Sequence, residues 1–233
     1  MARTRLAFVI TAVLFLAAMG FTSAVSDDQY LLISIALVIA SMLPFFIRFE
    51  VKKMQAREIV LIAVMAAIAA VGRVPFAPLP SVQPTSFVII VSALVFGAES
   101  GFMIGAFAAL VSNMFLGQGP WTPWQMFAWG MMGWTAGLLN RTGVLSSSRW
   151  LLLLFGAVWG MLFGWIMNFW LASGLLSQHD WGAIAALYAS SLYFDLAHAG
   201  SNVFFLMLFA ASWIKILQRF KRKYGLLQPN ETL

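Results

Sequence analysis

Long apolar runs without a single charged side chain dominate the sequence, and they restrict the chain to a lipid bilayer. Seven uncharged runs cover residues 6–25, 31–47, 59–72, 84–98, 101–116, 123–140 and 150–173, and an eighth covers residues 182–214 with Asp195 as its one charge. A transmembrane helix needs about 20 mostly apolar residues. Only 9% of the 233 residues are charged, whereas soluble domains carry about 25%. We therefore predict an all-α integral membrane protein, and we exclude a soluble enzyme and a nucleic-acid-binding module.

Basic side chains are distributed unevenly over the connections between these runs. If all eight runs cross the membrane, one set of connections and ends holds 13 of the 14 Lys and Arg residues, and the other holds only Arg73. Cytoplasmic loops carry an excess of Lys and Arg. The sequence thus predicts a multi-pass protein of the cell membrane with both termini in the cytoplasm. The formal net charge of +6 then indicates attraction to anionic lipid and no nucleic-acid partner.

A charged connector at residues 48–57 divides the chain. We predict a two-helix membrane module at residues 1–53, a six-span core at residues 54–223 and a cytoplasmic tail at residues 224–233. The first run also has features of a signal peptide, because basic residues precede it and Thr22-Ser23-Ala24 near its end resembles a small-residue cleavage site. Its cleavage would leave the topology of the remaining chain unchanged.

Small residues recur at intervals of four along the core runs. Ala63 and Ala67 form one such pair, and glycine repeats occupy residues 101–105, 133–137 and 156–164. Helices in lipid associate through close packing of small residues. Each repeat has two interpretations, namely packing inside one bundle or docking of a partner protein.

Polar side chains in the apolar runs gather toward the predicted outer side. Asp195, His198 and Asn202 share one helical face in the last run, and intramembrane polar groups commonly face a cavity or one another. The predicted substrate-binding set is Arg73, Gln83, Asn113, Gln118, Trp121, Trp124, Gln125, Asn168, Asp195, His198 and Asn202. Asn113 and Asn168 also suit hydrogen bonds between helices, and the Trp residues suit the interfacial aromatic belt.

The sequence lacks the motifs of the common catalytic and nucleotide sites. It contains no G-x-x-x-x-G-K-[ST], H-E-x-x-H or G-x-S-x-G motif, and it contains no cysteine. We expect no catalytic residues, no metal site, no bound cofactor and no enzyme activity.

From about Ala56 to the basic C-terminal segment, the chain resembles the substrate-binding S components of energy-coupling factor (ECF) vitamin transporters. The resemblance rests on six core spans, the Ala63-x-x-x-Ala67 face, and the tract at residues 94–105, which resembles the family's phenylalanine-glycine turn and the glycine-containing helix after it. Residues 80–84 and 117–125 look closest to cobalamin-linked S components.

This resemblance implies a six-helix S-component bundle, here preceded by two extra transmembrane helices. It implies capture of a vitamin, with cobalamin first, on the outer side by contacts that include Gln83, Gln118, Gln125, Asn168 and His198. It further implies a membrane scaffold subunit facing Ala63 and Ala67, and two cytoplasmic ATPases that hydrolyse the ATP. In such transporters the S component topples within the membrane, a motion that the attached N-terminal pair complicates.

Two other functions remain open at this point. One is a self-contained secondary transporter that uses Asp195 and His198 as a proton relay. The other is an intramembrane enzyme, whose sign would be chemical turnover that depends on Asp195.

Overall fold

The computed structural model describes residues 30–51, 54–177 and 179–227, and the regular structure in these ranges is helical. The elements are α2 (Tyr30–Val51), α3 (Ala56–Arg73), the short 3-10 helix η1 (Val74–Phe76), α4 (Thr85–Phe96), α5 (Ala98–Leu116), α6 (Thr122–Arg141), α7 (Val144–Ser147), α8 (Arg149–Ser177) and α9 (Trp181–Lys223). The predicted span at residues 6–25 lies outside the described residues. The other seven predicted spans correspond to α2, α3, α4, α5, α6, α8 and α9.

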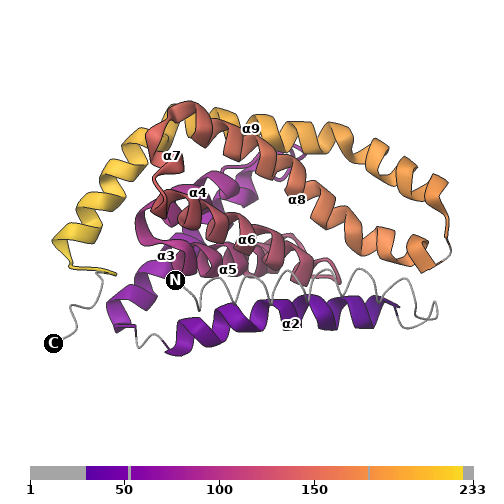
Figure 1. Ribbon diagram of the computed structural model, residues 1–233, viewed down its shortest axis with the longest axis horizontal. Coiled ribbons are helices and arrows are strands. Elements are labelled where there is room, and N and C mark those ends of the chain that lie inside the picture. Colours follow the sequence, from indigo (N-terminus) through magenta and orange to yellow (C-terminus); the bar gives the residue numbers. More distant parts are fainter. Residues whose placement is uncertain (1–29, 52–53, 178, 228–233) are drawn as a thin grey trace.

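The helices surround a short central helix, α4. In Figure 1, α8 and α9 form an arch on one side, α2 runs along the opposite side, and α3 to α6 lie between them. Helix α4 has only 12 residues, fewer than the 20 or so that cross a bilayer, and it contacts α3, α5, α6, α8 and α9. Nearly all of its side chains are buried, so α4 forms the interior of the bundle.

Helices α5 and α6 approach each other closely along their glycines. A Cβ atom on Gly101 would collide with the backbone of Gly133, and one on Gly133 would collide with the backbone of Gly101. Gly105 lies in the same way against the carbonyl of Trp129. Of the two interpretations of these repeats, packing within one bundle is therefore the one realised between α5 and α6.

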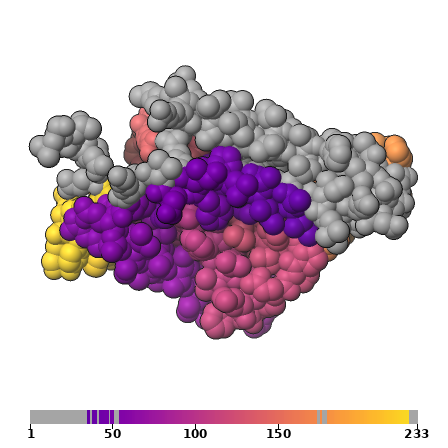
Figure 2. Space-filling view, turned by 90° about the horizontal axis from the view of Figure 1, so that it is seen from below, coloured from indigo at the N-terminus to yellow at the C-terminus, as the bar shows by residue number. Residues whose placement is uncertain are grey.

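Helix α2 packs on the core through aromatic rings. Phe45 stacks on Phe102 with 4.1 Å between ring centroids, and its ring meets Trp134 edge to face at 5.6 Å. Helix α2 contacts α5, α6 and α8, and Figure 2 shows it as an indigo band on the surface beside the purple α3. The predicted N-terminal module thus includes at least one helix that lies directly against the predicted core.

Several helices have the length and composition of membrane spans. Among the described residues, the stretches Ala56–Phe76, Ala98–Leu116, Arg149–Ala172 and Trp181–Lys223 are long and apolar enough to cross a bilayer. This supports the prediction of a multi-pass membrane protein. Helix α9 continues to Lys223, past the predicted end at residue 214, because its basic residues are good helix formers and nothing interrupts the backbone.

Candidate functional site

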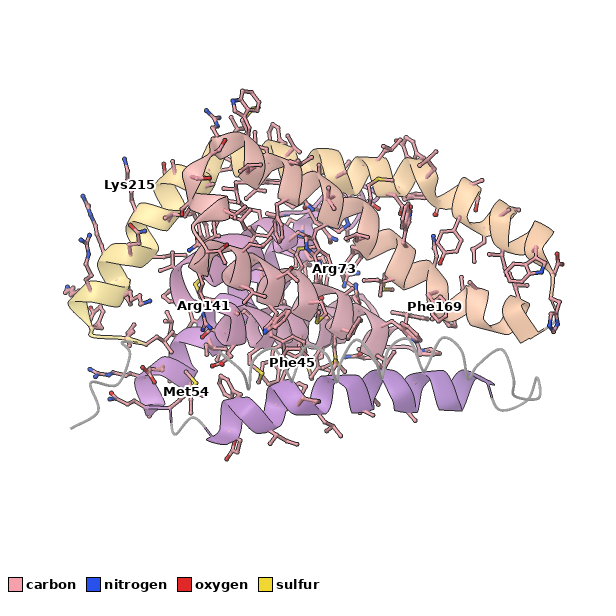
Figure 3. The ribbon with its side chains drawn as sticks, viewed as in Figure 1. Phe45, Met54, Arg73, Arg141, Phe169 and Lys215 are labelled. Carbon is pink, nitrogen blue, oxygen red and sulfur yellow. The ribbon has the colours of Figure 1, made fainter. Side chains whose placement is uncertain are left out.

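A cavity of about 580 Å³ lies in the half of the bundle that holds the end of α3 and the start of α6. It is lined by Arg73, Phe76, Ala77, Leu79, Ser81, Gln83, Leu116, Gln125, Phe163, Gly164, Met167, Asn168, Ser191, Phe194, Asp195 and His198. Figure 3 shows Arg73 among the helices. Lys215, in the C-terminal part of α9, points away from them. Six of the eleven predicted substrate-binding residues line this one cavity.

Arg73, at the end of α3, forms one wall. Its Nη1 donates to Asn113 Oδ1 at 2.6 Å and to Ser112 Oγ at 2.9 Å, both on α5. The guanidinium carbon lies 5.3 Å from the centre of the Trp129 ring, within the range of a cation–π interaction. Neutral acceptors and an aromatic face therefore hold this cation in a fixed orientation. When the Gln125 amide is placed with its oxygen toward Arg73, it accepts from Nη2 at 3.1 Å.

His198 forms part of the floor. Its Nε2 lies 2.7 Å from Ser86 Oγ on α4, and the same hydroxyl accepts a hydrogen bond from Trp129 Nε1 at 3.1 Å. Because a serine hydroxyl has one proton and two acceptor lone pairs, Ser86 can donate to Nε2 when the imidazole is protonated on Nδ1 and can accept from Nε2–H in the other tautomer. The imidazole also meets the Phe163 ring edge to face at 4.8 Å. These contacts hold the ring in place, and His198 belongs to the cavity lining.

Asp195 forms the wall on α9. Its Oδ2 accepts from Ser191 Oγ at 3.2 Å, and Ser191 accepts in turn from Asn168 Nδ2 on α8 at 2.6 Å. Gly164 on α8 lies against the carboxylate, and a Cβ at this position would collide with Oδ1. The glycine thus makes the room that lets a carboxylate lie between two packed helices.

The loop between η1 and α4 closes another side. Ser201 on α9 fixes this loop, because its hydroxyl accepts from the backbone N–H of Gln83 at 3.0 Å and lies 3.2 Å from the Gln83 carbonyl. The Gln83 backbone is thereby anchored to α9, and Gln83 belongs to the cavity lining.

Two opposite charges line the cavity without pairing. In the described part of the chain, neither Arg73 nor Asp195 forms an ion pair, and each is held by neutral side chains. Asp195 is only 4% exposed. Charged groups at membrane depth are costly and normally pair or serve a ligand, so the cavity has a cationic and an anionic wall ready for polar groups of a bound molecule.

The other five predicted residues do not line this cavity. Asn113 lies behind Arg73 and also donates to Thr122 Oγ1 at 3.1 Å, and Gln118 joins the α5–α6 turn by accepting from Thr122 at 2.9 Å. Trp124 is fully buried against Phe169. Trp121 packs near Trp170 with 6.2 Å between ring centroids. Asn202 is fully buried and donates to the carbonyl of Gly156 at 3.0 Å.

The structure also adds residues that the sequence did not single out. Ser191 lies four residues before Asp195, so helical spacing was a usable signal for it. Ser86 and Phe163 come from other helices, and no local pattern connects them with His198.

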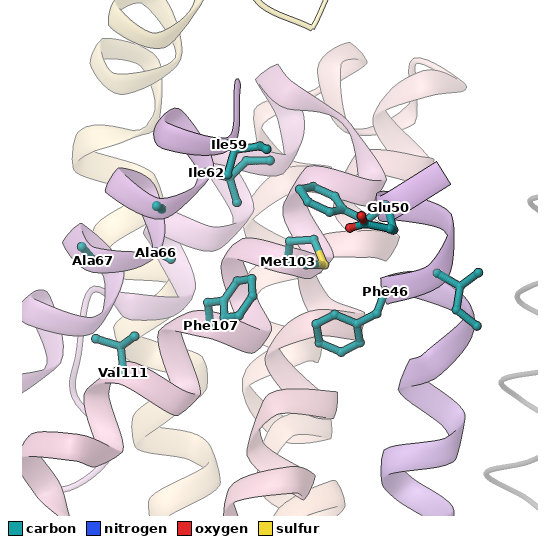
Figure 4. Close-up of a pocket in the computed structure, with 12 residues that line it drawn as sticks. Phe46, Glu50, Ile59, Ile62, Ala66, Ala67, Met103, Phe107 and Val111 are labelled. Carbon is teal, nitrogen blue, oxygen red and sulfur yellow. The ribbon is translucent and has the colours of Figure 1, made fainter. Parts of the chain in front are cut away.

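The predicted docking alanines lie elsewhere, on a separate apolar groove of about 750 Å³ between α2, α3 and α5. Figure 4 shows Ala67 and Ala66 of α3 on one side of this groove and Phe46 and Glu50 of α2 on the other. Ala63 and Ala67 are exposed, whereas Ala66 on the neighbouring face is buried. Exposure is what a docking role requires, and the role itself remains a prediction.

Comparison with known proteins finds similarity to UPF0397 proteins. A UPF0397 protein of Aliivibrio fischeri strain MJ11 is 27% identical over 124 residues, which cover 48% of this chain and 67% of the relative. A UPF0397 protein of Aliivibrio fischeri strain ATCC 700601 / ES114 matches to the same extent. No solved structure gives a significant match.

The model of one protein family matches residues 53–211, and its description is "ECF-type riboflavin transporter, S component". The matched region runs from just before α3 to within α9 and includes every residue that lines the 580 Å³ cavity. Because the match covers more than half of the sequence, the chain belongs to the family of ECF-type riboflavin transporter S components.

Proposed function

We propose that this protein captures a vitamin in the cavity between Arg73 and Asp195 and releases it to the cytoplasm as the substrate-specific subunit of an ECF importer. The observation that carries this proposal is the cavity itself, in which two unpaired opposite charges and a fixed imidazole face a common space. Family membership supports a transport role and gives no support to an enzyme.

The proposed ligand has acceptor groups for Arg73 and donor groups for Asp195. A guanidinium binds planar pairs of acceptors, such as a carboxylate, a phosphate or two ring carbonyls. The aromatic rings of Phe76, Phe163 and Phe194 line the same space and suit a flat, partly apolar ligand. A vitamin with a conjugated ring system and polar edges meets these requirements.

Two vitamins are candidates. A corrinoid such as cobalamin is the first candidate, because of the tracts at residues 80–84 and 117–125. Riboflavin is the second, because it is named in the family's description and because the cavity suits a compact ligand. The cavity volume of about 580 Å³ lies within the range of about 300–1,000 Å³ that is usual for small-molecule sites. A corrinoid is much larger and would extend out through the loop at residues 77–83.

The proposed partners supply the energy and the docking surface. The sequence has no P-loop, so we assign ATP hydrolysis to two partner ATPases and the connection to them to a membrane scaffold subunit. We propose that this scaffold contacts the exposed Ala63 and Ala67. The cavity then opens to the outside of the cell, which agrees with the predicted cytoplasmic termini.

Identification of the retained ligand tests this function. The chain is purified from cells grown with a mixture of vitamins, the small molecules that co-purify are identified by mass spectrometry, and each is titrated back onto stripped protein. A retained corrinoid supports the first candidate, and retained riboflavin supports the second. The absence of binding across the whole panel would contradict a vitamin-capture role.

Reconstitution separates this function from a proton-coupled secondary transporter. Vesicles that contain the chain alone are compared with vesicles that also contain the ECF scaffold and ATPases with ATP. We expect uptake of the identified vitamin only in the second preparation. Uptake by the chain alone, driven by a proton gradient and lost in Asp195→Asn, would establish the secondary transporter instead.

A further inference from the structure

A second cavity lies at the opposite end of the bundle from the vitamin site. It has a volume of about 440 Å³ and is lined mainly by residues from the end of α6, from α7, from the start of α8 and from the C-terminal half of α9, helices that are labelled in Figure 1. It is lined by Leu94, Asn140, Leu145, Ser146, Ser148, Arg149, Leu152, Leu153, Leu206, Met207, Ala210, Ala211, Ile214 and Gln218. We call it the α7–α9 cleft.

The lining of the cleft has an apolar part and a polar part. The part on α9 and on the second turn of α8 is apolar and includes Leu152, Leu206 and Ile214. The part at the helix ends is polar, and its residues are Asn140, Ser146, Ser148, Arg149 and Gln218. The cleft therefore combines an apolar floor with a polar rim, as a site for an amphipathic molecule requires.

The polar rim carries a positive charge without a counter-ion. Arg149 donates from Nη2 to the carbonyl of Met207 at 2.9 Å, and it forms no ion pair with any carboxylate in the described ranges. Residues 100–179 and 196–227, which supply all of the lining except Leu94, contain no Asp or Glu. The rim is thus complementary to an anion.

Further donors lie on the same rim. Ser148 Oγ accepts from the Trp150 backbone N–H at 3.2 Å, and no described residue accepts its hydroxyl proton. The Gln218 amide likewise has no hydrogen-bond partner within the described chain, and it is exposed. These groups lie among the lining residues with Arg149 and can donate to the oxygens of a phosphate.

The depth of the cleft in the membrane follows from its neighbours. The stretch of α8 that is long and apolar enough to cross a membrane begins at Arg149, and the adjacent Trp150 is 77% exposed. Trp is enriched at the level of the lipid headgroups. The rim therefore lies at the interface and the apolar floor faces the acyl chains, on the side predicted to be cytoplasmic.

We propose that the α7–α9 cleft binds one anionic phospholipid, with the phosphate at Arg149, Ser148 and Gln218 and one acyl chain along the apolar floor. Basic pockets between transmembrane helices on the cytoplasmic side bind such headgroups in membrane proteins. The cleft volume of about 440 Å³ lies within the range of about 300–1,000 Å³ that is usual for small-molecule sites, which leaves room for part of one lipid molecule. Because this site shares no residue with the vitamin cavity, it stands independently of the proposed ligand.

Native mass spectrometry of the purified full-length chain tests the site. The protein is exchanged into detergent with either phosphatidylglycerol or phosphatidylcholine, and the retained lipid is counted. We expect one phosphatidylglycerol to be retained in preference to phosphatidylcholine. Arg149→Gln should reduce this preference by about fivefold, the effect of one basic residue near the surface. Ala211→Trp, which keeps every charge and fills the floor, should remove retention of both lipids.

Arg57→Gln is the matched control, because Arg57 is an exposed arginine on the same predicted side and lies outside the cleft. It should retain phosphatidylglycerol as the wild type does. Equal retention of the two lipids by the wild type would overturn the proposal. So would a loss in Arg57→Gln as large as that in Arg149→Gln, or full retention in both Arg149→Gln and Ala211→Trp.

Discussion

Arg73 and Asp195 line the same cavity, and hydrogen bonds to neutral side chains, from α5 for Arg73 and from α9 for Asp195, hold them without pairing them. A direct ion pair would neutralise both charges and would have to be broken before a ligand could use either. Because the two charges are apart, each can interact with a ligand. The hydrogen bonds to Arg73 also orient its guanidinium before binding, which reduces the entropy lost when the complex forms.

Arg73→Gln should weaken binding of whichever vitamin co-purifies with the protein by at least about tenfold, because a hydrogen bond to a charged group contributes about 1.5–3 kcal/mol. Arg73→Lys should recover only part of the loss, since an ammonium lacks the planar fork. Isothermal titration on stripped protein measures the effect, and Arg57→Gln serves as the charge-matched control. An Arg73→Gln protein that is folded and binds like the wild type would exclude Arg73 from the site.

Gly164→Ala should damage the vitamin site through Asp195. The added Cβ collides with the Asp195 carboxylate, so the carboxylate must move out of its bond with Ser191. Gly200→Ala on α9 is the control, because nothing lies within 4 Å of its Cβ position. We expect about tenfold weaker binding in Gly164→Ala, by analogy with loss of one charge-assisted hydrogen bond. Gly200→Ala should bind normally, and equal affinities in the two variants would count against a role for Asp195.

Helix α3 has two faces with different tasks. Ala66, Ala69 and Ala70 are buried against the bundle, whereas Ala63 and Ala67 are exposed. The same small side chain thus serves close internal packing on one face and leaves a flat external surface on the other. Helix α2 stands across the groove from this surface (Figure 4), so any helix that docks on Ala63 and Ala67 also meets α2.

Ala67→Trp should prevent association with the ECF scaffold and leave vitamin affinity unchanged. The indole would fill the groove that the docking helix needs, and Ala67 lies outside the vitamin cavity. Co-purification of the scaffold with the tagged chain measures association, and titration of the vitamin measures the site. Leu154→Trp is the control, since Leu154 is 59% exposed on α8. Normal co-purification of Ala67→Trp would exclude this face as the contact.

The two ends of the whole bundle differ in charge and in the cavities they carry. The end with Arg73 and Asp195 holds the proposed vitamin site, and the end with Arg149 and the basic part of α9 holds the α7–α9 cleft. The turn after α9 is joined to the start of α3 at this second end, because the Leu227 N–H donates to Glu58 Oε1 at 2.7 Å. The positive-inside rule therefore predicts that the proposed vitamin site faces the outside of the cell.

Single introduced cysteines test this orientation by thiol labelling. The unmodified chain gives no background labelling, because its sequence has no cysteine. Leu79→Cys lies in the exposed loop at the vitamin end, and Ser146→Cys lies on exposed α7 at the other end. In intact cells, a membrane-impermeant thiol reagent should label Leu79→Cys and should label Ser146→Cys only after permeabilisation. The reverse pattern would show that both termini are outside.

Several features of the fold follow from local sequence. The apolar runs predict α2, α3, α4, α5, α6, α8 and α9, because a backbone in lipid must satisfy its hydrogen bonds within each helix. The break between α4 and α5 is local as well, since Gly97 has a φ of 92°, which glycine adopts at little cost. The face shared by Asp195 and His198 also follows from spacing along one helix.

The contacts of the candidate site depend on tertiary structure. Asn202 lies on the predicted face but turns to the carbonyl of Gly156, while Ser86, 112 residues before His198 in sequence, reaches its imidazole. Periodicity along one helix determines which side chains share a face. Which groups they meet depends on how close neighbouring helices come, and that distance is fixed by packing between residues far apart in the chain.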